Sequence, residues 1–224
     1  MHRTIKSFVM RAGRVSNRQQ QGLDIWLNDY QLPAPMEGVW DLTQAFKRTA
    51  DTIVEIGFGM GHSLLMMSKA KPELNYIGIE VHQAGVGSLA ADLHEQAIHN
   101  VCIAPYDAVE VFKSCIADDA LVGVQIFFPD PWPKKRHHKR RLIQIDFIQE
   151  LLKKIKSGGF IHCATDWQEY AEHMHAVLQA IPSLHNQQAD GGFAPRPETR
   201  PLTKFEQRGT RLGHGVWDLI YFKS

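Results

Sequence analysis

From residue 51 onward, short apolar runs alternate with amphipathic stretches. The apolar runs have the length of buried strands and lie at Thr52–Ile56, Tyr76–Val81, Val101–Pro105, Leu121–Phe128 and Phe160–Thr165. Helix-like stretches separate or follow them at about 62–70, 84–98, 108–116, 142–156 and 167–181. Strands that alternate with helices of this length predict βαβ units and a mostly parallel, doubly wound α/β sheet.

The two ends of the chain depart from this alternation. A last apolar run, Val216–Phe222, follows a long polar segment rather than a helix, so we expect an antiparallel strand inserted near the end of the sheet. Residues 1–50 are mixed and basic, and Pro33 and Pro35 mark a loop. We expect a basic extension at 1–50 that packs on a core formed by 51–224, giving a single domain overall.

Charge is distributed unevenly along the chain. The formal net charge is only +1, yet the first acidic residue is Asp24, and five basic residues precede it. The run Lys134–Arg141 holds six Lys or Arg, two His and no acid. Fields are screened within roughly 8 Å at physiological salt, so local patches matter more than the total charge. Two basic segments on a near-neutral body predict a directed anionic partner.

The cysteines, the histidines and the hydropathy disfavour several other classes of protein. Cys102, Cys115 and Cys163 are odd in number and widely spaced, which favours reduced thiols over a disulfide framework. His173 and His175 point to different helical faces, and no cluster has ligand spacing, so we expect no metal. No run reaches the ~18 apolar residues of a membrane span, and the N-terminus lacks a secretory pattern. We expect a cytoplasmic protein.

The turn after the first strand predicts a cofactor site. Glu55 and Ile56 lead into Gly57, Gly59 and Gly61, and a helix-like stretch follows. Glycines at this spacing let the backbone approach a ligand closely. An acid followed by G-x-G-x-G is typical of S-adenosylmethionine-dependent methyltransferases, whereas dinucleotide folds usually show G-x-G-x-x-G. A nucleotide site and a structural turn remain alternatives.

Acids follow the second and third strands as well. Glu80 ends the second strand, where a carboxylate can accept hydrogen bonds from ribose hydroxyls. Asp107 follows the third strand, where an acid can accept from an adenine amino group. The alternatives are surface carboxylates or helix caps, and Asp107 is a plausible N-cap.

The fourth strand ends in Asp130-Pro131-Trp132-Pro133, directly before the basic run. Prolines restrict both Asp130 and Trp132 to a narrow conformational range. A rigid carboxylate, a flat aromatic and a positive field indicate chemistry on a nucleic-acid base; the alternative is a strand end with a solvated basic loop. Trp132 either stacks on the base or closes the loop. We expect the basic run to bind RNA phosphates through Lys135, Arg136, Lys139, Arg140 and Arg141.

Six segments between residues 52 and 222 resemble, in order, the bacterial tRNA (guanine-N7-)-methyltransferases. They are Val54–Gly61, Gly78–His82, Phe128–His137, Ala164–Asp166, Thr203–Gly209 and Gly213–Leu219. The glycine motif is shared across methyltransferases, while the Pro-Asp-Pro-Trp-Pro-Lys and Thr-Lys-Phe-Glu blocks are far more specific.

The resemblance implies a Rossmann-like class I methyltransferase fold. It also implies transfer of a methyl group from S-adenosylmethionine, which becomes S-adenosylhomocysteine, to N7 of a guanosine at position 46 in the variable loop of tRNA. Asp130 is implied as the catalytic residue. The acids implied to bind the cofactor are Glu55, Glu80, Asp107 and Asp130. The residues implied to contact the substrate are Lys134, Asp166, Thr203, Lys204, Phe205 and Glu206.

The chemistry narrows the roles of the acids. The Watson–Crick edge of guanine presents two donors, so a carboxylate matches guanine and rejects adenine. Asp130, Asp166 or Glu206 is expected to read that edge. Three other interpretations remain open: a methyltransferase with another target, a non-catalytic RNA-binding module, and a nucleotide-dependent oxidoreductase. No strongly apolar exposed face is evident, so we expect a monomer without an obligate protein partner.

Overall fold

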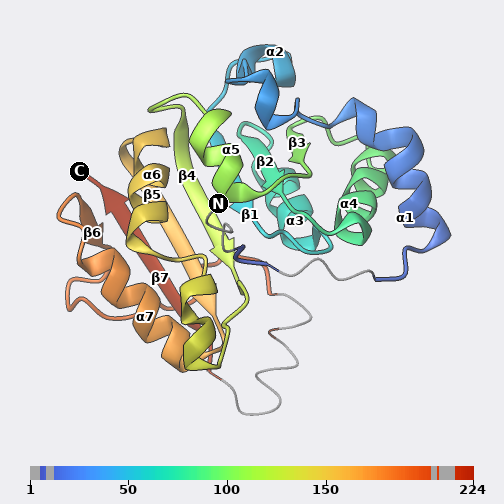
Figure 1. Ribbon diagram of the computed structural model, residues 1–224. Helices are drawn as coiled ribbons and strands as arrows, with labels where there is room; N and C mark the ends of the chain where they lie inside the picture. Colours follow the sequence, from blue (N-terminus) through green and yellow to red (C-terminus); the bar gives the residue numbers. More distant parts are fainter. Residues whose placement is uncertain (1–5, 9–12, 203–205, 207–214) are drawn as a thin grey trace.

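The computed structural model describes residues 6–8, 13–202, 206 and 215–224. Within these residues the centre of the fold is a seven-stranded sheet (Figure 1). Its strands are β1 (Thr52–Ile56), β2 (Asn75–Ile79), β3 (Val101–Ala104), β4 (Leu121–Phe127), β5 (Ile155–Thr165), β6 (Leu184–Asn186) and β7 (Trp217–Lys223). Their spatial order is β3-β2-β1-β4-β5-β7-β6. Strands β1 to β5 are parallel, while β7 is antiparallel to both β5 and β6. The predicted mostly parallel sheet and inserted last strand are confirmed.

The α-helices of the described residues are α1 (Asn17–Gln21), α2 (Leu42–Phe46), α3 (His62–Ala70), α4 (Gln83–Glu95), α5 (Ala108–Ser114), α6 (Ile145–Lys154) and α7 (Gln168–Gln179). Among these, helices α3 to α7 follow the predicted alternation, whereas α1 and α2 precede the first strand and were not predicted. Shorter helical turns are η1 (Gly22–Trp26), η2 (Leu27–Asp29), η3 (Pro35–Glu37) and η4 (Lys135–Arg140). The last of these is a 3-10 helix formed by the basic run.

The strands β5 and β6 differ most from the prediction. Strand β5 begins at Ile155, five residues before the predicted Phe160, because α6 ends at Lys154 and the chain enters the sheet at once. The pairing of β5 with β4 then shifts register between Leu121 and Gly123. Strand β6 was not predicted, because three residues are too few to show alternation.

Helices cover both faces of the sheet, as the doubly wound arrangement requires (Figure 1). One core cluster includes Phe112 of α5, Phe147 of α6 and Met174 of α7. The other cluster includes Leu64 of α3 and Leu89 of α4 on the opposite face. Because β1 to β4 are parallel, their carboxyl ends share one edge of the sheet, where ligands bind in open α/β folds.

Part of the N-terminal region lies against this core. The backbone of Ile103 in β3 donates to Tyr30 and accepts from Leu32, so residues 30–32 extend the sheet beyond β3. Leu32, Trp40 and Phe46 are buried in the first core cluster. These contacts cover the edge strand β3. The domain boundary at residue 50 stays a prediction.

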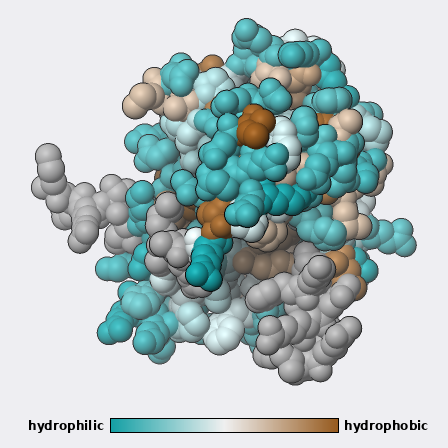
Figure 2. Space-filling model, turned by 90° about the vertical axis from the view of Figure 1, so that its right-hand side faces the viewer, coloured by the Kyte–Doolittle hydropathy of each residue, from teal (hydrophilic) through white to brown (hydrophobic). Residues whose placement is uncertain are grey.

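The outer surface over α1 and α4 is largely hydrophilic, with hydrophobic residues in small separated spots (Figure 2). Arg18 of α1 binds Asp92 and Glu95 of α4 across this surface, each at 2.7 Å. The three cysteines are buried and unpaired. Within the described ranges, no helix has the length and apolarity of a membrane span, and no three His, Cys, Asp or Glu side chains gather as metal ligands would.

Candidate active site

The glycine turn after β1 adopts a backbone that favours glycine. Gly57, Gly59 and Gly61 have φ values of 76°, 58° and 82°, in the left-handed region. A Cβ on Gly61 would also lie 2.8 Å from the Leu89 side chain. The Gly57 N–H donates to the carbonyl of Ile79 at 2.8 Å, which joins the turn to the end of β2. The turn therefore lies at the shared carboxyl edge of the sheet.

Glu80 lies at this edge and organises the turn. One oxygen accepts from the backbone N–H groups of Val81 and His82, at 2.8 and 3.0 Å. The other oxygen accepts from the Gly59 N–H at 3.0 Å. A carboxylate has about four acceptor positions, so this second oxygen keeps capacity for a ligand hydroxyl. The residue is 8% exposed and lines a cavity.

The cavity is about 200 Å³ in volume and opens at the strand ends. It brings together Gly57, Glu80, Asp107 and Asp130, which follow or end β1, β2, β3 and β4 in turn. Asp107 lines the cavity and also caps α5, accepting from the Val109 N–H at 3.0 Å. The helix-cap interpretation of Asp107 is confirmed, and its role toward an adenine amino group stays a prediction.

Glu55 lies in β1 rather than among the residues that line the cavity. It is 2% exposed, and one oxygen accepts from the Ser63 hydroxyl at 2.6 Å. Its other oxygen is buried and has no hydrogen-bond partner within the described part of the chain. Burial raises the pKa of Glu55 to about 7, and the Ser63 hydrogen bond offsets part of this rise. A buried acceptor without a partner beside the glycine turn suits a ligand that brings a donor.

The loop after β4 presents Asp130 to the cavity. Asp130 is exposed, and no side chain or backbone group among the described residues hydrogen-bonds to its carboxylate. Phe128 and Trp132, on either side, have φ values of 51° and 46°, which are rare for bulky residues. Such strain is held by surrounding contacts and often occurs at functional sites.

Arg141 supplies one of these supporting contacts, and here an expectation from the sequence is wrong. Its Nε donates to the carbonyl of Pro131 at 2.9 Å, and its guanidinium carbon lies 4.9 Å from the Tyr170 ring centroid. Glu169 pairs with it at 3.2 Å, and only 3% of Arg141 is exposed. A buried, bonded guanidinium does not reach a phosphate, so Arg141 supports the loop.

Most of the other Lys and Arg residues of the basic run are exposed. Lys134, Lys135, Arg136 and Lys139 are exposed, and Arg140 is half-buried. The Arg140 guanidinium carbon lies 4.0 Å from the Trp132 ring centroid, so one face of this indole is covered. The Trp132 Nε1 donates to the carbonyl of Ser7 at 3.1 Å, and Ser7 lines the cavity. Trp132 therefore closes the loop in this structure, and stacking of a base on the covered face would require Arg140 to move.

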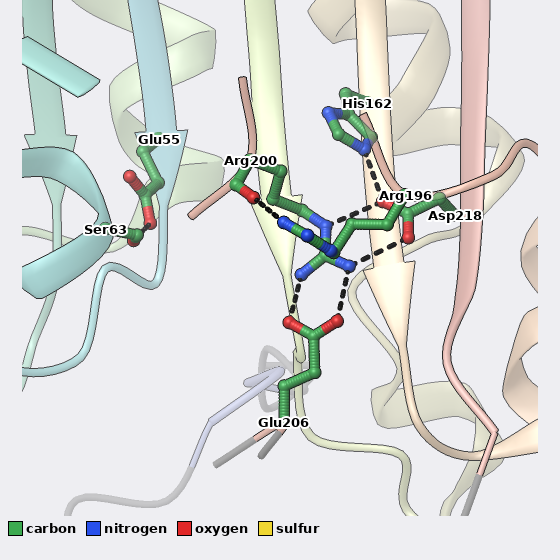
Figure 3. A network of polar contacts seen from close by, with 7 residues as sticks. All are labelled: Glu55, Ser63, His162, Arg196, Arg200, Glu206 and Asp218. Atoms are coloured by element: carbon green, nitrogen blue, oxygen red, sulfur yellow. Dashed lines mark hydrogen bonds and ion pairs between the residues drawn. The ribbon is translucent and has the colours of Figure 1, made fainter. Parts of the chain in front are cut away.

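The structure does not gather all the expected substrate residues in one place. Asp166 is half-buried and lines a separate shallow depression with Trp167 and Trp217. Glu206 is 4% exposed, and both its oxygens bind the guanidinium of Arg200, at 2.6 and 2.8 Å (Figure 3). Thr203, Lys204 and Phe205 lie outside the described residues.

Three members of the network around Glu206, which are Arg200, Asp218 and His162, were not predicted as site residues, and neither were Ser7 and Phe8 in the cavity lining. Arg200 lies in the polar segment that precedes the last apolar run, and Asp218 is an acid inside the apolar run of β7. An acid in an otherwise buried strand is a signal for a buried partner. The sequence does not indicate which cation supplies it.

Comparison with known proteins agrees with this geometry. A protein-family model described as "Putative methyltransferase" matches residues 49–219. Among solved structures, an aminoglycoside resistance methyltransferase superposes with a TM-score of 0.56 at 12% identity, covering 86% of this chain and 95% of that one. An rRNA methylase from Streptococcus thermophilus superposes with a TM-score of 0.52 at 10% identity, covering 78% and 87%. At such identities the likeness shows the fold alone, which is that of class I methyltransferases.

Relatives in sequence identify the family, which the solved structures do not. A tRNA (guanine-N(7)-)-methyltransferase of Legionella pneumophila (strain Paris) is 64% identical over 100% of this chain and 95% of its own length. One from Pseudomonas entomophila (strain L48) is 53% identical over 99% and 92%. The chain belongs to the tRNA (guanine-N7-)-methyltransferase family.

Proposed function

We propose that this protein transfers a methyl group from S-adenosylmethionine to N7 of a guanosine at position 46, in the variable loop of tRNA. One observation carries the assignment of the site: Gly57, Glu80, Asp107 and Asp130 converge on one cavity at the carboxyl edge of the parallel strands. Membership of the family supports the reaction, and the convergence of these residues supports the proposed location of the site.

The residues present suit the methyl donor. When bound, S-adenosylmethionine supplies an electrophilic methyl group on a positively charged sulfonium. Glu80 keeps an acceptor position for ribose hydroxyls, and Asp107 lines the cavity where an adenine amino group would need an acceptor. The unpartnered oxygen of Glu55 suits a donor that reaches beneath the glycine turn, such as an amino group. These acids match a ligand rich in donors and carrying positive charge.

The acceptor atom determines what else the site must provide. Guanine N7 carries a lone pair and no proton, so no base has to remove a proton before attack. The protein's task is to align the base and to stabilise the charge that develops on the methylated purine. Alignment can supply about 7–11 kcal/mol in well-oriented systems, and fixed charges add to it.

We assign recognition of the target guanine to Asp130. Its carboxylate is exposed at the cavity, and its loop is fixed by three prolines and by Arg141. A carboxylate there accepts from both donors of the guanine Watson–Crick edge and places negative charge near the purinium. Asp166 lies in a different depression and Glu206 is paired with Arg200, so Asp130 is the better placed of the three acids.

The tRNA backbone is held by the outward basic groups beside this loop. The members of this surface are Lys134, Lys135, Arg136, Lys139 and Arg140. Lys134 is the nearest to Asp130 in sequence and is the one we assign to the target nucleotide. Cavity and basic surface come from one chain, so we propose that the enzyme needs no protein partner. Because its relatives are tRNA methyltransferases, we also propose that it acts in the cytoplasm.

The reaction is tested by incubating purified protein with labelled S-adenosylmethionine and unmodified tRNA, then digesting the RNA and identifying the labelled nucleoside. N7-methylguanosine is the expected product. Another methylated nucleoside would keep the fold and donor but overturn the acceptor. Binding of tRNA without methyl transfer would favour a non-catalytic RNA-binding role.

A further inference from the structure

A buried charged network lies between β5, β7 and the segment that precedes Glu206 (Figure 3). Asp218 of β7 accepts from Arg200 Nε at 2.7 Å and from Nη2 at 2.9 Å. Arg200 Nη1 and Nη2 donate to the two oxygens of Glu206, at 2.6 and 2.8 Å. His162 of β5 lies 2.7 Å from Asp218. All four side chains are at most 5% exposed.

The geometry uses two edges of the Arg200 guanidinium and four of its five N–H donors. One edge of Arg200 binds Asp218 and the adjacent edge binds Glu206, so four hydrogen bonds fix its plane. Planar, two-point pairing of this kind is available to arginine and not to lysine. Although burial alone would raise the pKa of Asp218, hydrogen bonds from His162 and Arg200 lower it below its ordinary value. Asp218 therefore stays charged and holds Arg200 in place.

Arg200 also contacts the root of the Asp130 loop. Its guanidinium carbon lies 5.9 Å from the ring centroid of Phe127 and 5.6 Å from that of Phe128. Phe128 lines the cavity and precedes Pro129 and Asp130 directly. The Arg200 guanidinium thus contacts both Glu206 and the start of the loop that carries Asp130.

Burial makes this junction stiff. A buried ion pair gains little stability overall, but removing one partner leaves an unpaired buried charge and is strongly destabilising. The buried pair of Arg200 and Glu206 therefore resists separation. The backbone that carries Arg200 is fixed as well, since its carbonyl accepts from Arg196 Nη1 at 2.8 Å.

We propose that Arg200 is a positioning residue for methyl transfer: held by Asp218, it fixes Glu206 in relation to the Asp130 loop and thereby aligns the target guanosine. This inference rests on the proposed function and changes the role of one expected residue. Glu206 acts through Arg200 as an anchor, and the guanine edge is left to Asp130.

The test compares Arg200→Lys with wild type in the full-length protein. Tm is measured by thermal melting, the Kd of S-adenosylhomocysteine by calorimetry, and kcat and KM with transcribed tRNA. We expect kcat to fall at least about tenfold, while the Kd stays within about threefold, because Arg200 contacts none of Glu55, Glu80 and Asp107. Arg48→Lys is the matched control. Arg48 makes two hydrogen bonds, to Asn75 and to the Leu74 carbonyl, at the amino edge of the sheet.

A double-mutant cycle separates anchoring from direct contact. If Glu206 acts through Arg200, the variant with both Arg200→Gln and Glu206→Gln is no slower than the slower single variant. Additive losses in kcat would mean that Glu206 touches the substrate independently, which overturns the proposal. An Arg200→Lys protein with wild-type kcat, or one whose Kd weakens as much as its kcat falls, also overturns it.

Two further outcomes are distinguishable. If Arg200→Lys fails to fold, Glu206→Gln decides, because it removes one charge and keeps the shape: a folded variant with wild-type kcat overturns the proposal. If wild-type protein does not methylate tRNA at all, the proposed function itself fails, whatever Arg200 does.

Discussion

The carboxylate of Glu80 accepts a hydrogen bond from the backbone N–H of Gly59 at 3.0 Å, which ties the end of β2 to the glycine turn after β1. The same carboxylate accepts from Val81 and His82, so three N–H donors converge on it. One side chain thus fixes the shape of the turn and presents an acceptor to the cavity. Cofactor binding and local order depend on the same residue.

Glu80→Gln should therefore weaken the cofactor site. An amide has one acceptor oxygen, so its NH₂ group must face at least one of these N–H donors, at a cost of about 1–3 kcal/mol. We expect a lower Tm and an S-adenosylhomocysteine Kd raised about tenfold by calorimetry. Glu73→Gln, at an exposed position before β2, is the control and should change neither. Equal affinity in wild type and Glu80→Gln would contradict the role of Glu80.

Asp130→Asn should impair catalysis without unfolding the protein, because the carboxylate is exposed and bonded to none of the described residues. We expect kcat/KM for tRNA to fall about 10²-fold, the scale seen when a fixed polar group in an active site is removed. Asp166→Asn, in its separate depression, should lose much less. If kcat/KM falls more in Asp166→Asn than in Asp130→Asn, Asp166 rather than Asp130 recognises the guanine.

The exposed basic residues and Arg141 should behave differently. Replacing Lys135, Arg136 and Lys139 by Gln should make the slope of log K against log salt less negative by about 2–3, since each phosphate contact contributes about 0.7–0.9. Arg141→Gln should lower Tm and leave that slope unchanged, because its guanidinium binds Pro131 and Glu169. Filter-binding titrations at several salt concentrations measure both, and an unaltered slope in the triple variant would refute the basic surface.

Glu55 should make stability depend on pH. Burial raises its pKa from about 4.5 to about 7, partly offset by the Ser63 hydrogen bond, so the folded state binds this proton more tightly than the unfolded state. The resulting stabilisation is complete below pH 4.5 and is lost as pH rises through 7, with a size of up to about 3 kcal/mol. Urea unfolding at pH 5 and pH 8 measures it.

Two variants check the origin of this pH dependence. Glu55→Gln should remove the contribution, so that the stability difference between wild type and variant changes between the two pH values. Ser63→Ala should raise the pKa of Glu55 further and move the change to higher pH. If the difference in unfolding free energy between wild type and Glu55→Gln is the same at pH 5 and pH 8, Glu55 keeps an ordinary pKa.

Much of the sheet and the cavity could be predicted from the sequence, because both follow from local patterns. Buried parallel strands read as continuous apolar runs, and their carboxyl ends meet at one edge, which is why Glu80, Asp107 and Asp130 could be grouped from the sequence alone. The strand β6 was missed because its pairing with β7 depends on residues about 35 positions away rather than on its own three residues.

What could not be predicted depends on contacts between distant residues. A run of like charges does not show that Arg141 turns inward while Arg136 faces outward; that is decided by Pro131 and Tyr170. The pairing of Arg200 with Asp218 depends on where the polar segment lies against β7. The same holds for Trp132. Arg140 covers its ring, and its Nε1 donates to the carbonyl of Ser7, which lies far away in the sequence.

Transfer of the methyl group to guanine N7 is tested most sharply by changing that one ring atom of the acceptor. Two otherwise identical tRNAs, one with guanosine and one with 7-deazaguanosine at position 46, are assayed for methyl transfer from labelled S-adenosylmethionine. The deaza base keeps the Watson–Crick edge that Asp130 is proposed to read but replaces N7 by a C–H group. We predict binding of both tRNAs and methylation of the guanosine form alone. Equal methylation of both would contradict transfer to N7 at this position.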